Sequence, residues 1–304
     1  MKILNFGSLN IDYVYKVDSF LLPGETKSSI SMDIHCGGKG LNQSIAAAKA
    51  GNEVYHAAYL GNDGQMLKSI MEENGVNVDM VKNHDSTSGH AIIQVDKNGQ
   101  NCILLYGGTN QLLTEDFIDE VLDNFGNTGL VLLQNETNLV GYIIEKAAEK
   151  GLQVALNAAP MNEKVLGYPL EKLTWLIVNE VEGKQIAGCE KDEEIINVLR
   201  EKYPKCKILL TLGSNGACCY ADKVLHKIGC HKVNVVDTTA AGDTFTGYFL
   251  YGILNGSSIG NALQIATIAS SICVQRNGAA NSVPLKAEID EILGSFEKLE
   301  VTTE

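Results

Sequence analysis

Short, fully apolar segments alternate with amphipathic stretches along most of this chain. Apolar segments of four or five residues are typical of strands buried on both faces, and amphipathic segments are typical of helices. This order predicts a parallel sheet that is covered by helices on both faces. The expected strands are residues 3–6, 56–60, 130–133, 153–156, 175–178 and 207–211, and the expected helices include 41–50, 65–74 and 139–150.

Two regions depart from this order because polar and apolar residues alternate in them. Residues 11–35 form one region, and residues 91–95 and 102–106 form the other, on either side of a turn signal at 96–100. They predict a small antiparallel sheet beside the main body, as a lid, an interface or both. Near the C-terminus we expect a strand pair around a turn at 221–223, a strand at 233–236, helices at 244–255, 259–275 and 286–299, and a frayed polar tail.

The charge of the chain limits its partners. The 37 acidic and 24 basic side chains give a formal net charge of −13. Such a charge repels nucleic acid and anionic membranes, but a small anion can still bind to local backbone N–H groups and a lysine. The chain starts without a signal-peptide pattern and has no apolar run near the ~20 residues of a membrane span. We therefore expect a cytoplasmic protein whose eight cysteines are reduced.

The loop Asp237-Thr-Thr-Ala-Ala-Gly-Asp243 carries the strongest chemical signal. Small residues allow a ligand to approach the backbone, and the first N–H groups of a helix can bind an anion. Asp243, at the start of this helix, could be a simple cap. It could also be a base that deprotonates a hydroxyl while the neighbouring N–H groups hold a phosphate. The chain lacks the G-x-x-x-x-G-K-[ST] motif and a G-x-G-x-x-G that opens a helix after a strand, which argues against P-loop and dinucleotide-binding proteins.

Other polar or glycine-rich segments are expected to surround the same crevice. Three glycines around Lys39 precede a helix, and Asn10 and Asp12 follow the first strand, where they could bind neighbouring hydroxyls of a polyol. Ligands in open α/β sheets bind beyond the carboxyl ends of the strands. Further strand ends carry residues 134–136, 179–182 and 211–216.

Five of these segments resemble, in order and spacing, the ribokinase (PfkB) family of carbohydrate kinases. They are GSLNID, GGKGLN, NEVE, TLGSNG and DTTAAGDTF, and the resemblance extends to SVP at residues 282–284. The segments STSG, YGGTN and QNE, at residues 86–89, 106–110 and 134–136, support it. The resemblance implies a three-layer αβα sandwich with a mainly parallel central sheet and a small antiparallel β-sheet lid. It also implies one domain over residues 1–304, with the lid formed by residues 11–36 and 90–107.

The resemblance implies a role for residues in four groups. Asp243 matches the position of the family's general base, and the family's anion hole is matched by Ala240, Ala241 and Gly242. The implied sugar-binding set is Asn10, Asp12, Gly38, Lys39, Asn42, Glu136 and Asp243. The implied nucleotide-binding set is Asn179, Thr211, Leu212, Gly213, Ser214, Asn215, Gly216, Gly242, Asp243 and Thr267. Glu182 is linked with Mg²⁺, and a monovalent cation, usually K⁺, is bound by the loops of Asp237, Thr239, Cys273, Arg276, Gly278 and Ser282.

The implied reaction is ATP-dependent phosphorylation of the O5 hydroxyl of D-ribose, with Mg²⁺ and K⁺ as cofactors. Alternatives are transfer to deoxyribose, another sugar or a nucleoside, and a catalytically silent sugar-binding regulator. The family's motif GDD-x-x-G stands here as Gly61-Asn-Asp-Gly-Gln-Met66, which leaves the sugar less constrained than the reaction. The resemblance also implies a homodimer formed through the lid.

A zinc site is the competing interpretation of one segment. Cys218, Cys219, His226, Cys230 and His231 lie close together in the sequence. Their spacing matches no closed Cys/His site, and the same residues fit a pair of strands joined by a turn. We therefore interpret them as structural.

Overall fold

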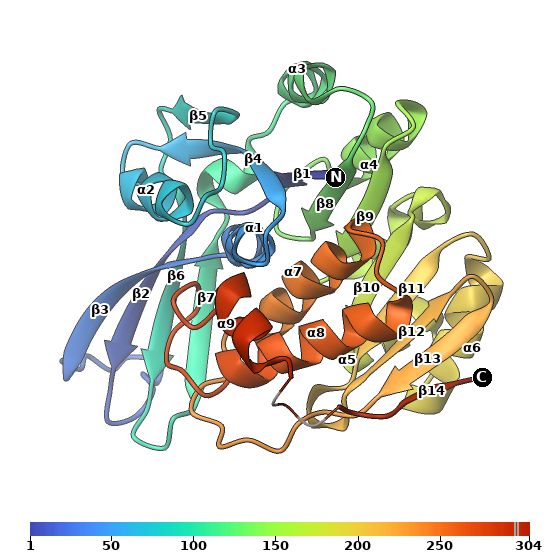
Figure 1. Cartoon of the computed structure of the whole chain (residues 1–304). Helices are drawn as coiled ribbons and strands as arrows, with labels where there is room; N and C mark the ends of the chain where they lie inside the picture. The colour runs from blue at the N-terminus through green and yellow to red at the C-terminus, as the bar shows by residue number, and fades with distance from the viewer. Residues whose placement is uncertain (295, 297) are drawn as a thin grey trace.

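The computed structural model describes residues 1–294, 296 and 298–304, and contains a large and a small sheet (Figure 1). In the large sheet the strand order is β14-β13-β12-β11-β10-β9-β8-β1-β4-β5. The strands from β11 to β5 in this order pair in parallel, and the remaining pairs are antiparallel. The strands are β1 (Lys2–Phe6), β4 (Glu53–Gly61), β5 (Val81–His84), β8 (Leu130–Gln134), β9 (Gln153–Asn157), β10 (Trp175–Asn179), β11 (Lys207–Thr211), β12 (Ala217–Ala221), β13 (Val224–Ile228) and β14 (Val301–Thr303).

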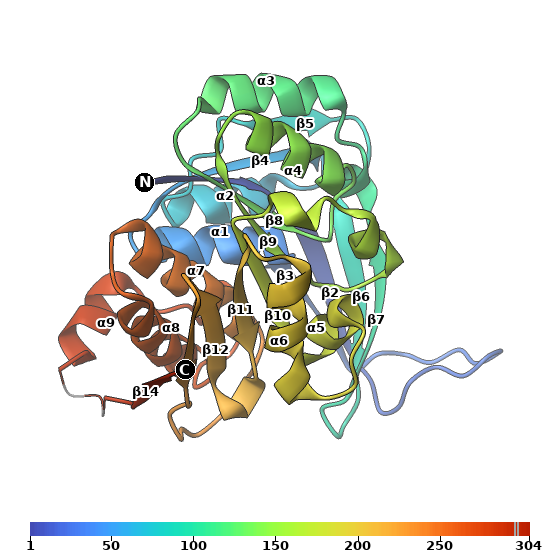
Figure 2. The same cartoon turned by 90° about the vertical axis from the view of Figure 1, so that its right-hand side faces the viewer.

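Helices cover both faces of the large sheet, as the alternation of segments predicts (Figure 2). One face packs on α1 (Lys39–Lys49), α2 (Gln65–Glu73), α7 (Ala241–Leu254), α8 (Ile259–Cys273) and α9 (Lys286–Ile292). The other packs on α3 (Glu115–Phe125), α4 (Val140–Glu149), α5 (Glu180–Ala187) and α6 (Asp192–Lys202). Because side chains alternate along a strand, Ile3 belongs to the first core and Leu4 to the second. No helix in the described part of the chain has the length and hydropathy needed to cross a membrane.

The small sheet extends from one side of the body, with strand order β3-β2-β6-β7 (Figure 1). Its strands are β2 (Asn10–Lys16), β3 (Ser31–Gly37), β6 (Gly89–Val95) and β7 (Asn101–Tyr106). The two outer pairings are antiparallel, as expected, whereas the central pair, β2 and β6, is parallel. The segment between β2 and β3 projects away from the body (Figure 2).

Three expectations near the C-terminus are wrong. Residues 233–236 form no strand, because β14 pairs with β13 and occupies the sheet edge beyond it. The expected frayed tail is this same β14, and Lys227 forms an ion pair with Glu304 across the pairing. The helix expected over 286–299 ends at Ile292 and is followed by a turn at Leu293 and Gly294, since glycine disfavours helix. Within that range, Ser295 and Glu297 lie outside the described residues.

Candidate active site

Glycines bring the first strand and the first helix into close contact. A Cβ on Gly40 would lie 2.2 Å from the backbone nitrogen of Ser8, and a Cβ on Gly37 would lie 2.0 Å from a carboxylate oxygen of Asp12. Gly38, which precedes α1, has a φ of +96°, a conformation that L residues rarely adopt. The motif GGKG thus allows α1 to start directly against the end of β1 and beside β2.

The implied sugar-binding residues meet where the small sheet joins the body. The carboxylate of Glu136, which follows β8, accepts hydrogen bonds from the Ser8 hydroxyl and from the backbone N–H of Lys39, the latter at 2.9 Å. Asn110 lies in the 3-10 helix Gly108–Gln111; it donates from Nδ2 to Asn10 Oδ1 at 2.7 Å and accepts from the N–H of Leu9. Ser8 and Asn110 were not among the predicted site residues, although they belong to the quoted segments GSLNID and YGGTN.

Asp12 is an acid in an unfavourable environment. It lies on β2, and its backbone is paired on both sides, with His35 on β3 and Ala91 on β6. Burial, and then the negative charge of Glu136, raise its pKa from 3.8 to about 7. Two neighbouring carboxylates without a bound cation are costly, and this favours a ligand that donates hydroxyl hydrogens to them.

Asp243 lies in the first turn of α7 and is 8% exposed. Ala240, which precedes the helix, has a left-handed φ of 59°, and Gly242 has open space where a side chain would lie. Burial raises the pKa of Asp243, while the positive charge of Lys39 and hydrogen bonds from Gln43 and Asn42 lower it. The Ala241 N–H donates to Thr238 O at 3.2 Å. The N–H groups of Gly242 and Asp243 lie in the first turn of α7, where no preceding helical turn supplies carbonyl acceptors.

A cavity of about 680 Å³ opens beside the N-terminal end of α7. Of the implied nucleotide-binding set, it is lined by Asn179, Thr211, Gly213, Ser214, Gly216, Gly242 and Thr267. Leu212, Asn215 and Asp243 are not in its lining; Leu212 packs on a hydrophobic core instead. The lining also includes Val233, Val235, Phe245 and Val274, which our sequence reasoning missed as cavity residues. The signal available was an apolar segment at 233–236, but we expected it to be a strand.

Asn179 and Glu182 cap helix α5 reciprocally. Asn179 Oδ1 accepts from the N–H of Glu182 at 2.9 Å, and Glu182 Oε2 accepts from the N–H of Asn179 at 3.0 Å. Glu182 is buried, which raises its pKa, and the charge of Lys39 acts in the opposite direction. Lys39 therefore interacts electrostatically with carboxylates from both α5 and α7, which places all three near one another.

The loops implied in cation binding are held together by Asp237. Its Oδ1 accepts from the N–H and hydroxyl of Thr239, and its Oδ2 accepts from the N–H of Gly278 at 3.0 Å. Cys273 Sγ lies 3.1 Å from the hydroxyl oxygen of Ser282. Asp237 thus connects the loop before α7 with the loop after α8.

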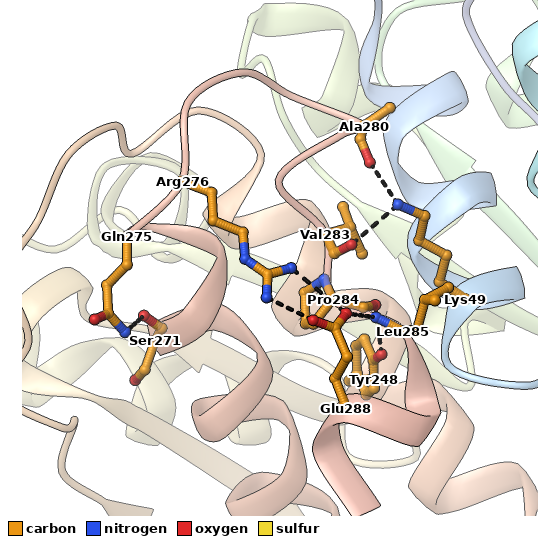
Figure 3. A network of polar contacts seen from close by, with 10 residues as sticks. All are labelled: Lys49, Tyr248, Ser271, Gln275, Arg276, Ala280, Val283, Pro284, Leu285 and Glu288. Atoms are coloured by element: carbon orange, nitrogen blue, oxygen red, sulfur yellow. Dashed lines mark hydrogen bonds and ion pairs between the residues drawn. The ribbon is translucent and has the colours of Figure 1, made fainter. Parts of the chain in front are cut away.

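The second of these loops is held from outside by side chains (Figure 3). Lys49, at the end of α1, donates to the carbonyls of Ala280 and Val283, both at 3.0 Å. The guanidinium of Arg276 pairs with Glu288 at 2.6 Å. Because a guanidinium has no acceptor atom, only the carbonyl of Arg276 could serve as a ligand for a cation.

The residues of the zinc interpretation lie mostly in a strand pair. Cys219 is opposite His226 in the antiparallel pairing of β12 and β13, which confirms the expected pair. In the part of the chain that the structure describes, no group of three or more His, Cys, Asp or Glu side chains could hold a metal ion. Cys230 instead donates to Ser214 O, and both residues line the cavity beside α7.

Comparison with known proteins identifies similar sequences along the whole chain. Residues 1–286 match the model of the family described as pfkB family carbohydrate kinase. A ribokinase of Haemophilus influenzae is 33% identical, over 94% of this chain and 96% of its own. A deoxyribokinase of Salmonella typhimurium is 31% identical, over 96% and 99%. A bifunctional ribokinase/ribose-5-phosphate isomerase A of Fructilactobacillus sanfranciscensis is 35% identical, and the chain spans 56% of its length.

The fold is likewise similar to solved structures. A ribokinase of Arabidopsis thaliana, complexed with ribose and ATP, superimposes with a TM-score of 0.85 at 27% identity, covering 97% of this chain and 99% of the other. The three-layer arrangement and the small sheet of the present chain therefore match a known architecture.

Proposed function

The chain belongs to the pfkB family of carbohydrate kinases, and from this we propose that it transfers the γ-phosphoryl group of ATP to the O5 hydroxyl of D-ribose. The observation that carries the proposal is the position of Asp243. It is a buried carboxylate at a helix N-terminus, between a large cavity and a cluster of polar side chains suited to a polyol. The name ribokinase on several relatives over nearly the whole chain supports ribose as the acceptor.

We propose that Asp243 takes the proton of the acceptor hydroxyl. Its burial raises its pKa, which makes it a better base than an exposed aspartate, while the positive charge of Lys39 favours its ionised form. Of the implied anion hole, the N–H groups of Ala240 and Gly242 would hold the charge on the transferring phosphoryl group, and Ala241, whose N–H donates to Thr238 O, would keep this turn in place. Phosphoryl transfer depends mainly on such positioning and charge neutralisation.

The sugar-binding role is proposed for residues of both sheets. Asn10, Asp12, Glu136 and the Oδ1 of Asn42 supply acceptors, Lys39 supplies donors, and Gly38 allows close approach. Asn42 Oδ1 is buried without a hydrogen-bond partner among the described residues, as expected for an atom whose partner is a ligand hydroxyl. We propose that the small sheet closes over the sugar as a lid and excludes water.

Two cations are part of the proposal. Mg²⁺ would neutralise phosphate charge; Asn179 lines the cavity, and the carboxylate of Glu182, which is hydrogen-bonded to Asn179 just behind the lining, is of the type that suits this hard ion. For K⁺ the available donors are oxygens: the Asp237 carboxylate, the Ser282 hydroxyl and carbonyls of the two loops that Asp237 connects. By linking these loops, Asp237 and Thr239 keep the start of α7 in place beside the phosphate site.

We also propose a cytoplasmic location, where ATP is available. All eight cysteines are free thiols, and Cys206 and Cys219 are deeply buried, as suits a reducing compartment.

The acceptor is tested by a substrate panel. With ATP, Mg²⁺ and K⁺, the purified protein is expected to turn over ribose with a kcat/KM at least about 10-fold above those of deoxyribose, hexoses and nucleosides. Release of ADP measures turnover, and omission of K⁺ tests the cation. Preference for deoxyribose would support the alternative raised by the deoxyribokinase relatives. Ribose binding without turnover would instead support a sugar-binding regulator.

We propose that two chains associate through the small sheet. Its edge strand β7 exposes Ile103, Leu104, Leu105 and Tyr106, each more than half accessible. A run of exposed apolar side chains on an unpaired strand edge is unusual for a surface that stays in water.

The dimer predicts a change in mass. The wild-type protein is expected to sediment at twice the mass of one chain, and Leu104→Glu to weaken association by about 10-fold or more, because a charge would be buried in an apolar interface. Leu166→Glu is the matched control, since Leu166 is also about half exposed but lies in the main body. A wild-type protein that sediments as a single chain at assay concentration would rule out this association.

A further inference from the structure

A network of buried, hydrogen-bonded polar side chains lies beneath the candidate active site. It connects Asn5 on β1, His56 on β4, Gln134 on β8, and Gln43 and Ser44 on α1, and each of the five is at most 1% exposed. Asn5 and His56 are register partners on neighbouring strands and point to the face that packs on α1. Strand centres of this kind are usually apolar, so these residues require an explanation.

The orientation of the three side-chain amides in this buried network, those of Asn5, Gln134 and Gln43, follows from one backbone carbonyl. Gly40 O can only accept, so the Nδ2 group of Asn5 faces it, at 2.9 Å. Asn5 Oδ1 must then face Gln134, whose Nε2 donates to it at 3.2 Å. The same Nε2 donates its second hydrogen to Gln43 Oε1 at 2.8 Å.

Gln43 therefore has its oxygen committed, and its Nε2 is directed at Asp243. It donates to Asp243 Oδ1 at 2.9 Å. We infer that Gln43 positions the catalytic carboxylate, and that Asn5 sets the orientation of Gln43 through Gln134. This inference deepens the proposed function, because it assumes that Asp243 acts on the acceptor hydroxyl.

The chemical consequence concerns both the geometry and the charge of the base. A carboxylate held through Oδ1 can rotate little, so its second oxygen is presented to the acceptor in one direction. The donated hydrogen bond also stabilises the ionised form against burial. The other groups acting on this carboxylate are Lys39, by its charge, and Asn42, by a hydrogen bond, and both come from α1.

A branch of the same network of side chains leads away from the site and provides a control. Asn5 Nδ2 also donates to Ser44 Oγ at 2.8 Å, and Ser44 Oγ lies 2.8 Å from His56 Nδ1. Burial lowers the pKa of His56 to about 4, so its ring is neutral and its Nε2 donates to Gly7 O. Loss of this branch leaves Gly40 O in place, and with it the orientation of Asn5.

The primary variant is Gln43→Met, which keeps the length of the side chain and removes the amide. We expect kcat to fall about 10-fold or more while KM for the sugar changes less than about twofold, since Gln43 hydrogen-bonds to the base, Asp243, and among the described residues its amide forms no hydrogen bond with the rest of the sugar-binding set. The acidic limb of the kcat/KM profile should move to higher pH, by about half a pH unit or more, because the ionised carboxylate loses a donor. An unmoved limb with an unchanged kcat would overturn the inference.

Two distant variants test the orientation. Asn5→Leu makes the strand apolar throughout and removes the acceptor that orients Gln134, so it should move the acidic limb in the same direction by a smaller amount. If Gln43→Met does not fold, this variant tests whether the network positions Asp243. Ser44→Ala should leave the limb where it is. Equal profiles for both variants would refute the role of Asn5. The assays use whichever sugar the wild-type protein turns over best, so failure with ribose rejects the proposed acceptor without affecting these comparisons.

Discussion

Asp243→Asn is expected to lower kcat by about 10²- to 10⁴-fold, the usual contribution of a general base. Asparagine keeps the size of the side chain and accepts the hydrogen bond from Gln43, but it cannot take a proton from the acceptor hydroxyl. Binding of ribose and ATP, followed by calorimetry, should change much less than kcat. Burial raises the pKa of Asp243, so wild-type activity should decline on acidification at a higher pH than an ordinary aspartate would produce.

The matched control for this change is Asp116→Asn. Asp116 also lies in the first turn of a helix, α3, but it is exposed and is not part of the cavity lining. It should leave kcat unchanged, which separates loss of the base from loss of a charge at a helix N-terminus. Undiminished turnover in Asp243→Asn would remove this residue from the mechanism.

The sequence was sufficient to predict the main sheet and the edge of it at which the candidate site residues gather. Strands such as residues 130–133 are apolar throughout, which is typical of strands buried on both faces, and the structure places them in the parallel part of the sheet. Once these strands are parallel, the segments that follow β1, β8, β10 and β11 must meet at one edge. Glu136 and Asn179 were predicted to lie there for this reason.

Features that depend on distant pairing could not be predicted in the same way. Nothing local indicates that β2 pairs in parallel with β6, about 80 residues later, or that residues 301–303 occupy the edge that residues 233–236 were expected to join. The polar network beneath the site also depends on distant pairing, since Gln43 and Gln134 are 91 positions apart. Its one local signal was Asn5, a polar residue in the middle of an apolar strand.

Asp12→Asn is expected to weaken ribose binding by about 10- to 100-fold, because hydrogen bonds to charged groups contribute about 1.5–3 kcal/mol. The pKa of Asp12 is raised to about 7 by burial and by Glu136, so the wild-type protein should also lose affinity as the pH falls from 8 to 6. Calorimetric titration with ribose over this range measures both effects. The variant should show a much smaller pH dependence, since it has no carboxylate at this position to protonate.

The same substitution should stabilise the protein at high pH. A folded-state pKa above the unfolded value of 3.8 means that the folded protein binds the proton more tightly, so the free energy of unfolding falls as pH rises from about 4 to 7. Asp12→Asn removes this dependence and should be more stable than wild type at pH 8, by about 1–2 kcal/mol after allowance for solvent screening, and by roughly a third of that difference at pH 5. Asp33→Asn, an exposed change on β3 of the same sheet, should show neither effect. Urea denaturation at both pH values measures the difference, and equal slopes against pH for Asp12→Asn and wild type would contradict it. If both predictions hold, affinity and stability oppose each other at Asp12, as expected where a site keeps a partly buried carboxylate for its ligand.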